Sequence, residues 1–166
     1  MGLPRRTAEI EAFWRGFADH SGAADRYAVV AFGDGPAMAS ELADLVVAGT
    51  KRATASLRRD YVDGGEPLPG VGDLVLVVDG DGTPRCIWRT TQIDIKPLIA
   101  VDDRFAWDEG EGDRTRAWWL DAHRGYFGRQ AAHEGFAFND EIETVFERFT
   151  VVWPLAIADR DNAVAR

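Results

Sequence analysis

The chain has 166 residues, 46% of them hydrophobic and 28% charged, so it is long enough to bury a core without a disulfide or a structural metal. Its formal net charge of −9 argues against a protein that grips duplex DNA through many phosphates. A nucleotide or a short single strand stays compatible, because a local basic pocket can lie on an acidic surface. The single cysteine, Cys86, excludes an internal disulfide and a cysteine zinc site.

No targeting segment is recognisable at the beginning of the sequence. Residues 1–6 are short and polar, and no apolar run follows them as in a signal peptide. No stretch approaches the roughly 20 apolar residues of a membrane span. We therefore expect a cytoplasmic protein without a membrane partner.

The first 50 residues predict two helices with a strand between them. A helix over residues 7–20 would begin at the N-cap Thr7. Its apolar residues recur at helical spacing: Ile10, Phe13, Trp14 and Phe17. The run YAVVAF at 27–32 predicts a strand. Pro36 suits the first turn of the second helix, which we expect to stop at Gly49.

The middle of the chain predicts antiparallel strands. We expect one strand from Ala53 to about Val62, then a turn-rich loop over 64–73. The apolar run LVLVV at 74–78 and the segment RCIWRTTQIDI flank the turn signal DGDGTP, which indicates a hairpin.

The last third of the chain begins with acidic residues and ends with a strand. Six acids fall between Asp102 and Asp113, and Asp113 is the expected cap of a helix. That helix carries four residues with apolar side chains: Trp118, Trp119, Ala122 and Tyr126. Residues 142–153 predict a long closing strand.

Several strands with two or three helices indicate an α+β fold. A small β-barrel with helices at its rim fits the pattern, because closure of a barrel removes exposed sheet edges. We expect one domain over residues 1–154, including the N-terminal helix, and a frayed tail over 155–166.

The segment GTKRATASL, residues 49–57, lies where the second helix meets the next strand. Strand alternation puts Ala53, Ala55 and Leu57 on an apolar face. Thr54 and Ser56 fall on the opposite, polar face. Lys51 has the parity of the apolar face, so either the chain kinks there or the lysine caps the end of the helix, where its charge is favourable.

The sequence GTKRAT resembles the G-x-K-x-x-T motif of ASCH domains, which are relatives of the PUA RNA-binding fold. The resemblance extends in order over about residues 10–154, through AFGDGPAMASELADLVVAGTKRATASL, GEPLPGVGDLVLVVDGDGTPRCIWRTTQIDI, FAWDEGEGDRTRAWWLDAHRGYF and ERFTVVWP. It implies a PUA-like barrel with helices packed around a cleft, and Lys51 and Thr54 at the floor of that cleft. The position of Arg52 departs from the commonest form of the motif, in which a smaller residue is usual.

The resemblance also implies a link to RNA. Some members similar to this chain are ribonucleases, and a more distant group hydrolyses an amide of acetylated cytidine with a lysine base, a threonine nucleophile and a glutamate acid. Lys51 and Thr54 match the first two by motif. Glu109 lies in the equivalent acidic segment, and Asp108 and Glu111 are its rivals.

Two kinds of chemistry are open to Lys51 and Thr54. A threonine hydroxyl attacks only when a base takes its proton, and lysine serves as a base only when burial lowers its pKa. A carboxylate beside it, such as Glu109, opposes this, and the two groups then titrate as a pair. Alternatively, charged Lys51 with the hydroxyls of Thr54 and Ser56 holds a phosphate or an oxyanion. A cationic Arg52 either favours an anionic ligand further or points to solvent.

Three further residues are candidates for contacting a ligand. Trp88 and Arg89 would supply a stacking surface and a second cation, with core packing as the alternative for the tryptophan. Tyr126 shares a helix face with His123, and either this face turns toward the cleft or it packs on the sheet. The histidines are scattered and form no recognisable zinc site. The acidic run from Asp102 to Asp113 either binds a divalent ion or is a solvated loop with one functional acid.

The sequence therefore supports three hypotheses. The first is a hydrolase acting on RNA or a modified nucleoside through Lys51, Thr54 and Glu109, with no metal and no cofactor. The second is a module that binds single-stranded RNA or a nucleotide without chemistry. The third is a protein that binds another protein through exposed tryptophans. The substrate, the oligomeric state and the pathway are not readable from the residues.

Overall fold

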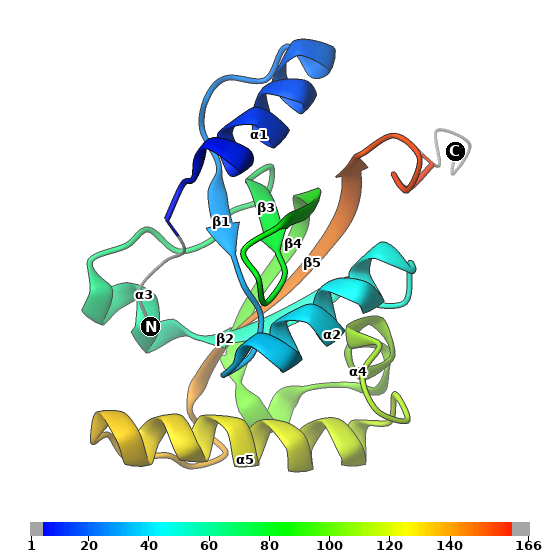
Figure 1. Ribbon diagram of the computed structural model, residues 1–166. Coiled ribbons are helices and arrows are strands. Elements are labelled where there is room, and N and C mark those ends of the chain that lie inside the picture. Colours follow the sequence, from blue (N-terminus) through cyan, green and yellow to red (C-terminus); the bar gives the residue numbers. More distant parts are fainter. Residues whose placement is uncertain (1–4, 161–166) are drawn as a thin grey trace. The chain divides into compact units, whose positions relative to one another are not determined.

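The computed structural model describes residues 5–160, which form five α-helices and one five-stranded sheet (Figure 1). The helices are α1 (Ala8–Ser21), α2 (Pro36–Val47), α3 (Arg58–Gly64), α4 (Asp103–Glu109) and α5 (Arg116–Glu134), with a 3₁₀ turn at Leu98–Ala100. The strands are β1 (Ala28–Val30), β2 (Ala53–Leu57), β3 (Leu74–Val78), β4 (Pro84–Pro97) and β5 (Glu143–Trp153), in the sheet order β1-β3-β4-β5-β2. The α+β class is confirmed. Within residues 5–160, no helix has the length and apolarity needed to cross a bilayer.

The chain divides into two compact units. The first comprises the described parts of 1–49, 71–91 and 149–166, and the second comprises 50–70 and 92–148. The long strands β4 and β5 each contribute residues to both units. The expected tail over 155–166 lies partly outside the described residues, which end at 160.

The first unit contains α1, α2 and the β3–β4 hairpin, as the sequence predicts. The Thr7 hydroxyl accepts the Ile10 N–H at 3.2 Å, which caps α1. Strand β1 pairs in parallel with β3, and β3 pairs antiparallel with β4. Trp88 on β4 stacks on Phe149 with ring centroids 4.0 Å apart, inside a cluster of buried apolar residues. The core-packing alternative for Trp88 is therefore observed.

The second unit contains β2, α3, α4 and α5. Strand β2 runs antiparallel to β5, and Ala53, Leu57 and Phe146 join one buried cluster with Phe105 and Trp119. The alternation expected for β2 is confirmed, because Ala53, Ala55 and Leu57 all pack against this cluster. Helices α4 and α5 contact each other.

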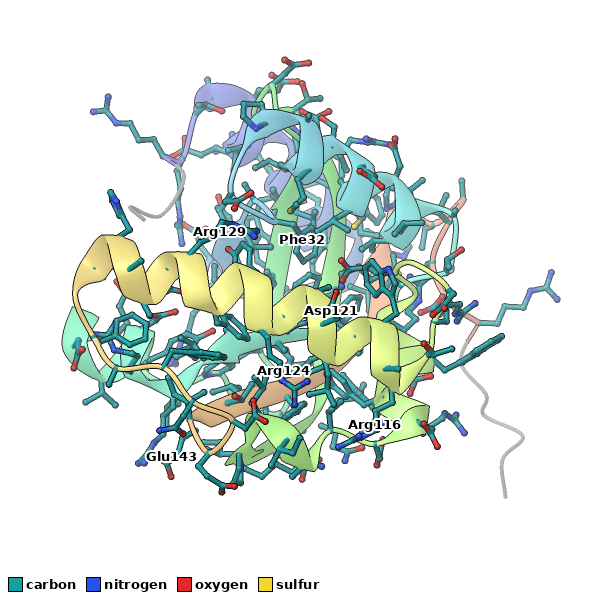
Figure 2. The ribbon with its side chains drawn as sticks, turned by 90° about the horizontal axis from the view of Figure 1, so that it is seen from below. Phe32, Arg116, Asp121, Arg124, Arg129 and Glu143 are labelled. Atoms are coloured by element: carbon teal, nitrogen blue, oxygen red, sulfur yellow. The ribbon has the colours of Figure 1, made fainter. Side chains whose placement is uncertain are left out.

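Charged side chains on α5 fix the helix to loops of the same unit. Figure 2 looks onto α5 and labels four of its charged side chains, of which Arg116 and Arg124 make these contacts. The Arg116 guanidinium donates to the carbonyls of Val101 and Ile99, each at 2.6 Å. Arg124 donates to both carboxylate oxygens of Asp140, at 2.9 and 2.8 Å. Such paired contacts set the rotation of the helix about its axis.

The strand expected from Ala53 to about Val62 is wrong beyond Leu57. Residues 58–64 form α3, which ends at Gly65 in the left-handed conformation with φ 68°. Arg59 and Asp63 form an i,i+4 ion pair at 2.9 Å, which favours a helix over a strand. The Tyr61 hydroxyl also lies 2.8 Å from the Ser56 hydroxyl, so the helical turn folds back onto β2.

The expected cap of the last helix is also wrong. Thr115 is the N-cap of α5, since its hydroxyl accepts the Trp118 N–H at 3.1 Å. Asp113 supports this cap from outside, because its carboxylate accepts the N–H and the hydroxyl of Thr115 at 2.9 and 2.6 Å. The acidic run also contains α4, a helix that the sequence reading did not predict; Asp102 caps it by accepting the Phe105 N–H at 2.8 Å.

Candidate functional site

Lys51 is the centre of a buried charge cluster in the second unit. Its side chain and that of Glu109 are each 1% exposed, and the lysine ammonium donates to the Glu109 carboxylate. The same ammonium donates to Glu111 Oε2 at 3.0 Å, and the Glu111 side chain is 18% exposed. Of the predicted site residues, the structure therefore brings together Lys51 and Glu109, and it adds Glu111.

The backbone around this cluster holds the end of α4 against residues 50–52. The Arg52 N–H donates to the Asp108 carbonyl at 2.7 Å. Gly110 has φ 73°, and a Cβ atom there would lie 2.5 Å from the Thr50 carbonyl oxygen. Only glycine fits such an approach. Arg114 donates to the carbonyls of Trp107 and Thr50 at 2.7 and 3.4 Å, which closes the loop around the cluster.

Asp108, one of the three rival acids, directs its carboxylate to other partners. Its Oδ2 atom accepts from Arg148 Nε at 3.0 Å, and both of its oxygens lie 3.3 Å from Arg104 Nε. Glu109 and Glu111, not Asp108, therefore contact the lysine. The two-residue spacing of these glutamates across Gly110 makes this possible, because the left-handed glycine reverses the chain after α4.

His123 on α5 is also part of the cluster. It lies near the carboxylate oxygen of Glu109 that Lys51 does not contact. Its Nε2 atom lies 3.5 Å from Glu109 Oε1, whereas Lys51 contacts Oε2. Its Nδ1 atom lies 2.8 Å from the Trp119 carbonyl, which only accepts, so Nδ1 carries a proton. The ring stacks on Trp119 with centroids 3.7 Å apart. The sequence put His123 on a helix face with Tyr126 that either turns toward the cleft or packs on the sheet, and His123 was not among the predicted site residues. A polar ring four residues after a buried tryptophan was the available signal.

The charges of the cluster follow from burial and pairing. Burial opposes the charge of Lys51, but Glu109 and Glu111 outweigh it and raise the lysine pKa. Burial likewise opposes ionisation of Glu109, but Lys51 and His123 outweigh it and hold the pKa of that carboxyl far below its usual range. Pairing therefore wins over desolvation at Lys51, which is charged at neutral pH.

Glu111 behaves in the opposite way. Burial raises the pKa of Glu111 to about 7, and repulsion from Glu109 adds to the effect of burial, while Lys51 opposes both. Near neutral pH the cluster thus contains a charged lysine and an ionised Glu109, beside a second glutamate with a raised pKa. Perturbed pKa values of this kind are commoner at functional sites than elsewhere.

The cluster also contains donor atoms of a kind that bind metal ions. One ligand atom each from Glu109, Glu111 and His123 lies within 4.8 Å of the others. The Lys51 ammonium, however, donates to both carboxylates and provides the positive charge that a cation would bring. With that ammonium in place, the three side chains do not fit a metal ion, because the ion and the ammonium would compete for the same carboxylate oxygens.

Thr54 lies on the polar face of β2, half-buried, and pairs in register with Glu147 on β5. Within residues 5–160, no hydrogen bond joins its hydroxyl to the Lys51 ammonium. Glu147 is only 5% exposed and was not predicted as a site residue. An acid directly after Phe146 in a strand with several apolar residues was the signal for it. Side chains opposite each other on paired strands lie about 5 Å apart at Cβ, so Thr54 and Glu147 are neighbours.

The other predicted ligand-contacting residues lie outside the charge cluster. Ser56 bonds with Tyr61, and the Arg52 guanidinium donates to the Lys51 carbonyl at 2.8 Å. Tyr126 is half-buried and packs edge-on against Phe127, with centroids 5.4 Å apart. Arg89 is exposed, and Trp88, 2% exposed, belongs with it to the first unit. A ligand-binding role for these residues stays a prediction.

Comparison with known proteins identifies the family. The ASCH domain family matches residues 28–153, so the chain belongs to it. The fold is similar to the crystal structure of an ASCH domain from Lactobacillus crispatus JV V101, with a TM-score of 0.77, 33% identity, and 85% of this chain and 92% of that chain covered. It is also similar to a crystal structure of a protein from Enterococcus faecalis V583, with a TM-score of 0.79, 33% identity, and 87% and 88% covered. No curated protein matched the chain.

Proposed function

We propose that this protein is a hydrolase that acts on single-stranded RNA or on a modified nucleoside, without a metal, through Lys51, Thr54 and Glu109. The observation that carries the proposal is the burial of Lys51 between two glutamates inside the G-x-K-x-x-T motif. Burying three ionisable groups is expensive and is poor evidence of a stabilising role, whereas functional sites commonly contain such clusters. We also propose that this site lies in a cleft of a PUA-like barrel and that the protein is cytoplasmic.

The charge states of the cluster indicate which chemical role each residue would have. A charged Lys51 stabilises negative charge on a phosphate or on the oxygen of an attacked carbonyl. It is not ready to remove the Thr54 proton, since a base must first be neutral. If Lys51 acts as the base, it must first pass a proton to a carboxylate of the cluster. With an acylated nucleoside, the Thr54 oxygen would then bond to the acyl carbon while neutral Lys51 takes the hydroxyl proton. The C–N bond would break as the lysine returns that proton to the leaving amine, and water would hydrolyse the threonine ester to the free acid.

The second candidate function is binding of RNA or a nucleotide without chemistry. The raised pKa of Lys51 favours it, because a permanently charged ammonium suits an anion anchor better than a base. In this case the ligand would saturate the site, and no product would form over long incubation. Neither proposal includes duplex DNA, because the net charge of −9 argues against it.

Mass spectrometry of reaction products distinguishes the two candidates. The protein is incubated, with chelator, with a short single-stranded RNA and separately with a set of acylated nucleosides. Thr54→Val removes the hydroxyl at nearly constant volume, and Thr54→Ser, which keeps the hydroxyl, is the matched control. Product from the wild type and the serine variant, but not from the valine variant, supports the hydrolase. Substrate binding without product from any variant supports the binding module.

A further inference from the structure

The family resemblance implies that Glu109 is the acid of the site, but its surroundings keep its carboxyl group ionised, so it has no proton to donate. Its Oε2 atom accepts from the Lys51 ammonium, and its buried Oε1 atom makes no hydrogen bond to any described residue but lies 3.5 Å from His123 Nε2. The side chain is 1% exposed, so water does not reach it directly. An ionised carboxylate held in this way is an acceptor only.

Glu111 has the contacts that a proton-exchanging group needs. Its Oε2 atom lies 3.0 Å from Lys51 Nζ, so it shares the lysine with Glu109. Its side chain is 18% exposed, against 1% for Glu109, and it follows Gly110 in the loop between α4 and α5. It is thus the carboxyl of the cluster that touches both the lysine and the solvent side.

His123 fixes the charge of Glu109 rather than reaching Lys51. The Trp119 carbonyl accepts from Nδ1–H, and stacking on the Trp119 ring holds the imidazole plane. Nε2 is thereby aimed at Glu109 Oε1. From this position His123 helps Lys51 to lower the pKa of the Glu109 carboxyl.

We propose that Glu111 is the group of this site that exchanges a proton, and that His123 is a positioning residue that keeps Glu109 ionised. The inference rests on the proposed function for its chemical purpose, but the location of the mobile proton is a property of the protein alone. The groups that face Glu111 are Lys51, from the segment before β2, Glu109, at the end of α4, and His123, from α5. The raised pKa of Glu111 agrees with this assignment.

The test follows glutamate side-chain carboxyl carbons by NMR during a pH titration of the protein labelled with ¹³C at Cδ of glutamate. We expect one carboxyl with a midpoint near pH 7, and its signal to be absent in Glu111→Gln. In His123→Phe, which keeps a ring against Trp119, a second carboxyl should begin to titrate at higher pH than in the wild type. Glu141→Gln, at an exposed position of the same unit, is the control and should leave both features unchanged.

Two results would overturn the assignment: a near-neutral carboxyl that persists in Glu111→Gln, or no glutamate titrating above pH 5.5. If His123→Phe leaves every other midpoint unchanged, the positioning role is refuted. The rate of product formation gives an independent readout, because Glu111→Gln should remove the change of slope near pH 7 from the rate profile. If the wild type yields no product, the hydrolase proposal fails, and the NMR midpoints still decide where the proton is.

Discussion

Replacing Glu111 with glutamine should change how the stability of the protein depends on pH. The folded protein raises the pKa of Glu111 from its ordinary value of 4.5 to about 7. Between these two values the folded state holds a proton that the unfolded state has released. The free energy of unfolding of the wild type therefore falls as the pH rises from 4.5 through 7, and this loss is absent below pH 4.5. Glutamine resembles the protonated acid and does not titrate.

The size of the effect follows from the shift. A difference of about 2.5 pKa units corresponds to about 3 kcal/mol, an upper bound for a side chain that is partly in contact with water. The free energy of unfolding of Glu111→Gln minus that of the wild type should thus increase by up to about 3 kcal/mol between pH 4.5 and pH 8.

Urea denaturation at half-unit steps from pH 4.5 to 8.5 measures this difference directly. Groups that titrate elsewhere in the chain contribute equally to both proteins and cancel in the subtraction. The exposed Glu141→Gln variant should run parallel to the wild type over the whole range. A difference between Glu111→Gln and the wild type that stays constant with pH would refute the reasoning.

Three further outcomes are expected. Lys51→Met should lower the free energy of unfolding at pH 7 by about 3–5 kcal/mol, because Glu109 is left buried without its partner. In urea denaturation the double variant Lys51→Met/Glu109→Gln should be more stable than Lys51→Met alone, and equal stability of the two variants would contradict the argument. Gly110→Ala should cost about 1–3 kcal/mol, since it combines a positive φ with a clash at 2.5 Å, whereas Gly128→Ala on α5, with no atom within 4 Å of the new Cβ, should be neutral or stabilising by thermal denaturation. Thr115→Ala should lower stability by about 1 kcal/mol through loss of the α5 cap, and an unchanged melting temperature would contradict the assignment of that cap.

Periodicity predicted the longer elements because their burial is regular. The stripe of α1 and the alternation of β2 both appear where the apolar residues place them. The wrong predictions concern segments in which local hydrogen bonds and ion pairs determine the secondary structure. Residues 58–62 were expected to continue the strand that begins at Ala53, but the Arg59–Asp63 pair and the hydrogen bond between Tyr61 and Ser56 favour a helical turn.

The motif predicted the lysine of the site but not all of the side chains around it. Spacing along the chain cannot show that Asp108 contacts Arg148 while Glu111 contacts Lys51, because Asp108 lies within α4 and Glu111 follows the left-handed Gly110 that ends this helix. His123 was equally hidden, since its role depends on a carboxylate supplied by another helix. Whether burial or ion pairing determines the pKa of Lys51 depends on its distances to Glu109 and Glu111, which the sequence does not contain.

The Lys51–Glu109 pair also has a consequence for how the chain folds. The two residues are 58 positions apart, so their contact closes a long loop, and the entropy of closure must be offset by packing that forms at the same time. Until then each charge is hydrated and either one alone would resist burial. The cluster can therefore form only once residues 50–57 and the α4–α5 segment have met, and a chain fragment that ends before residue 109 lacks the site.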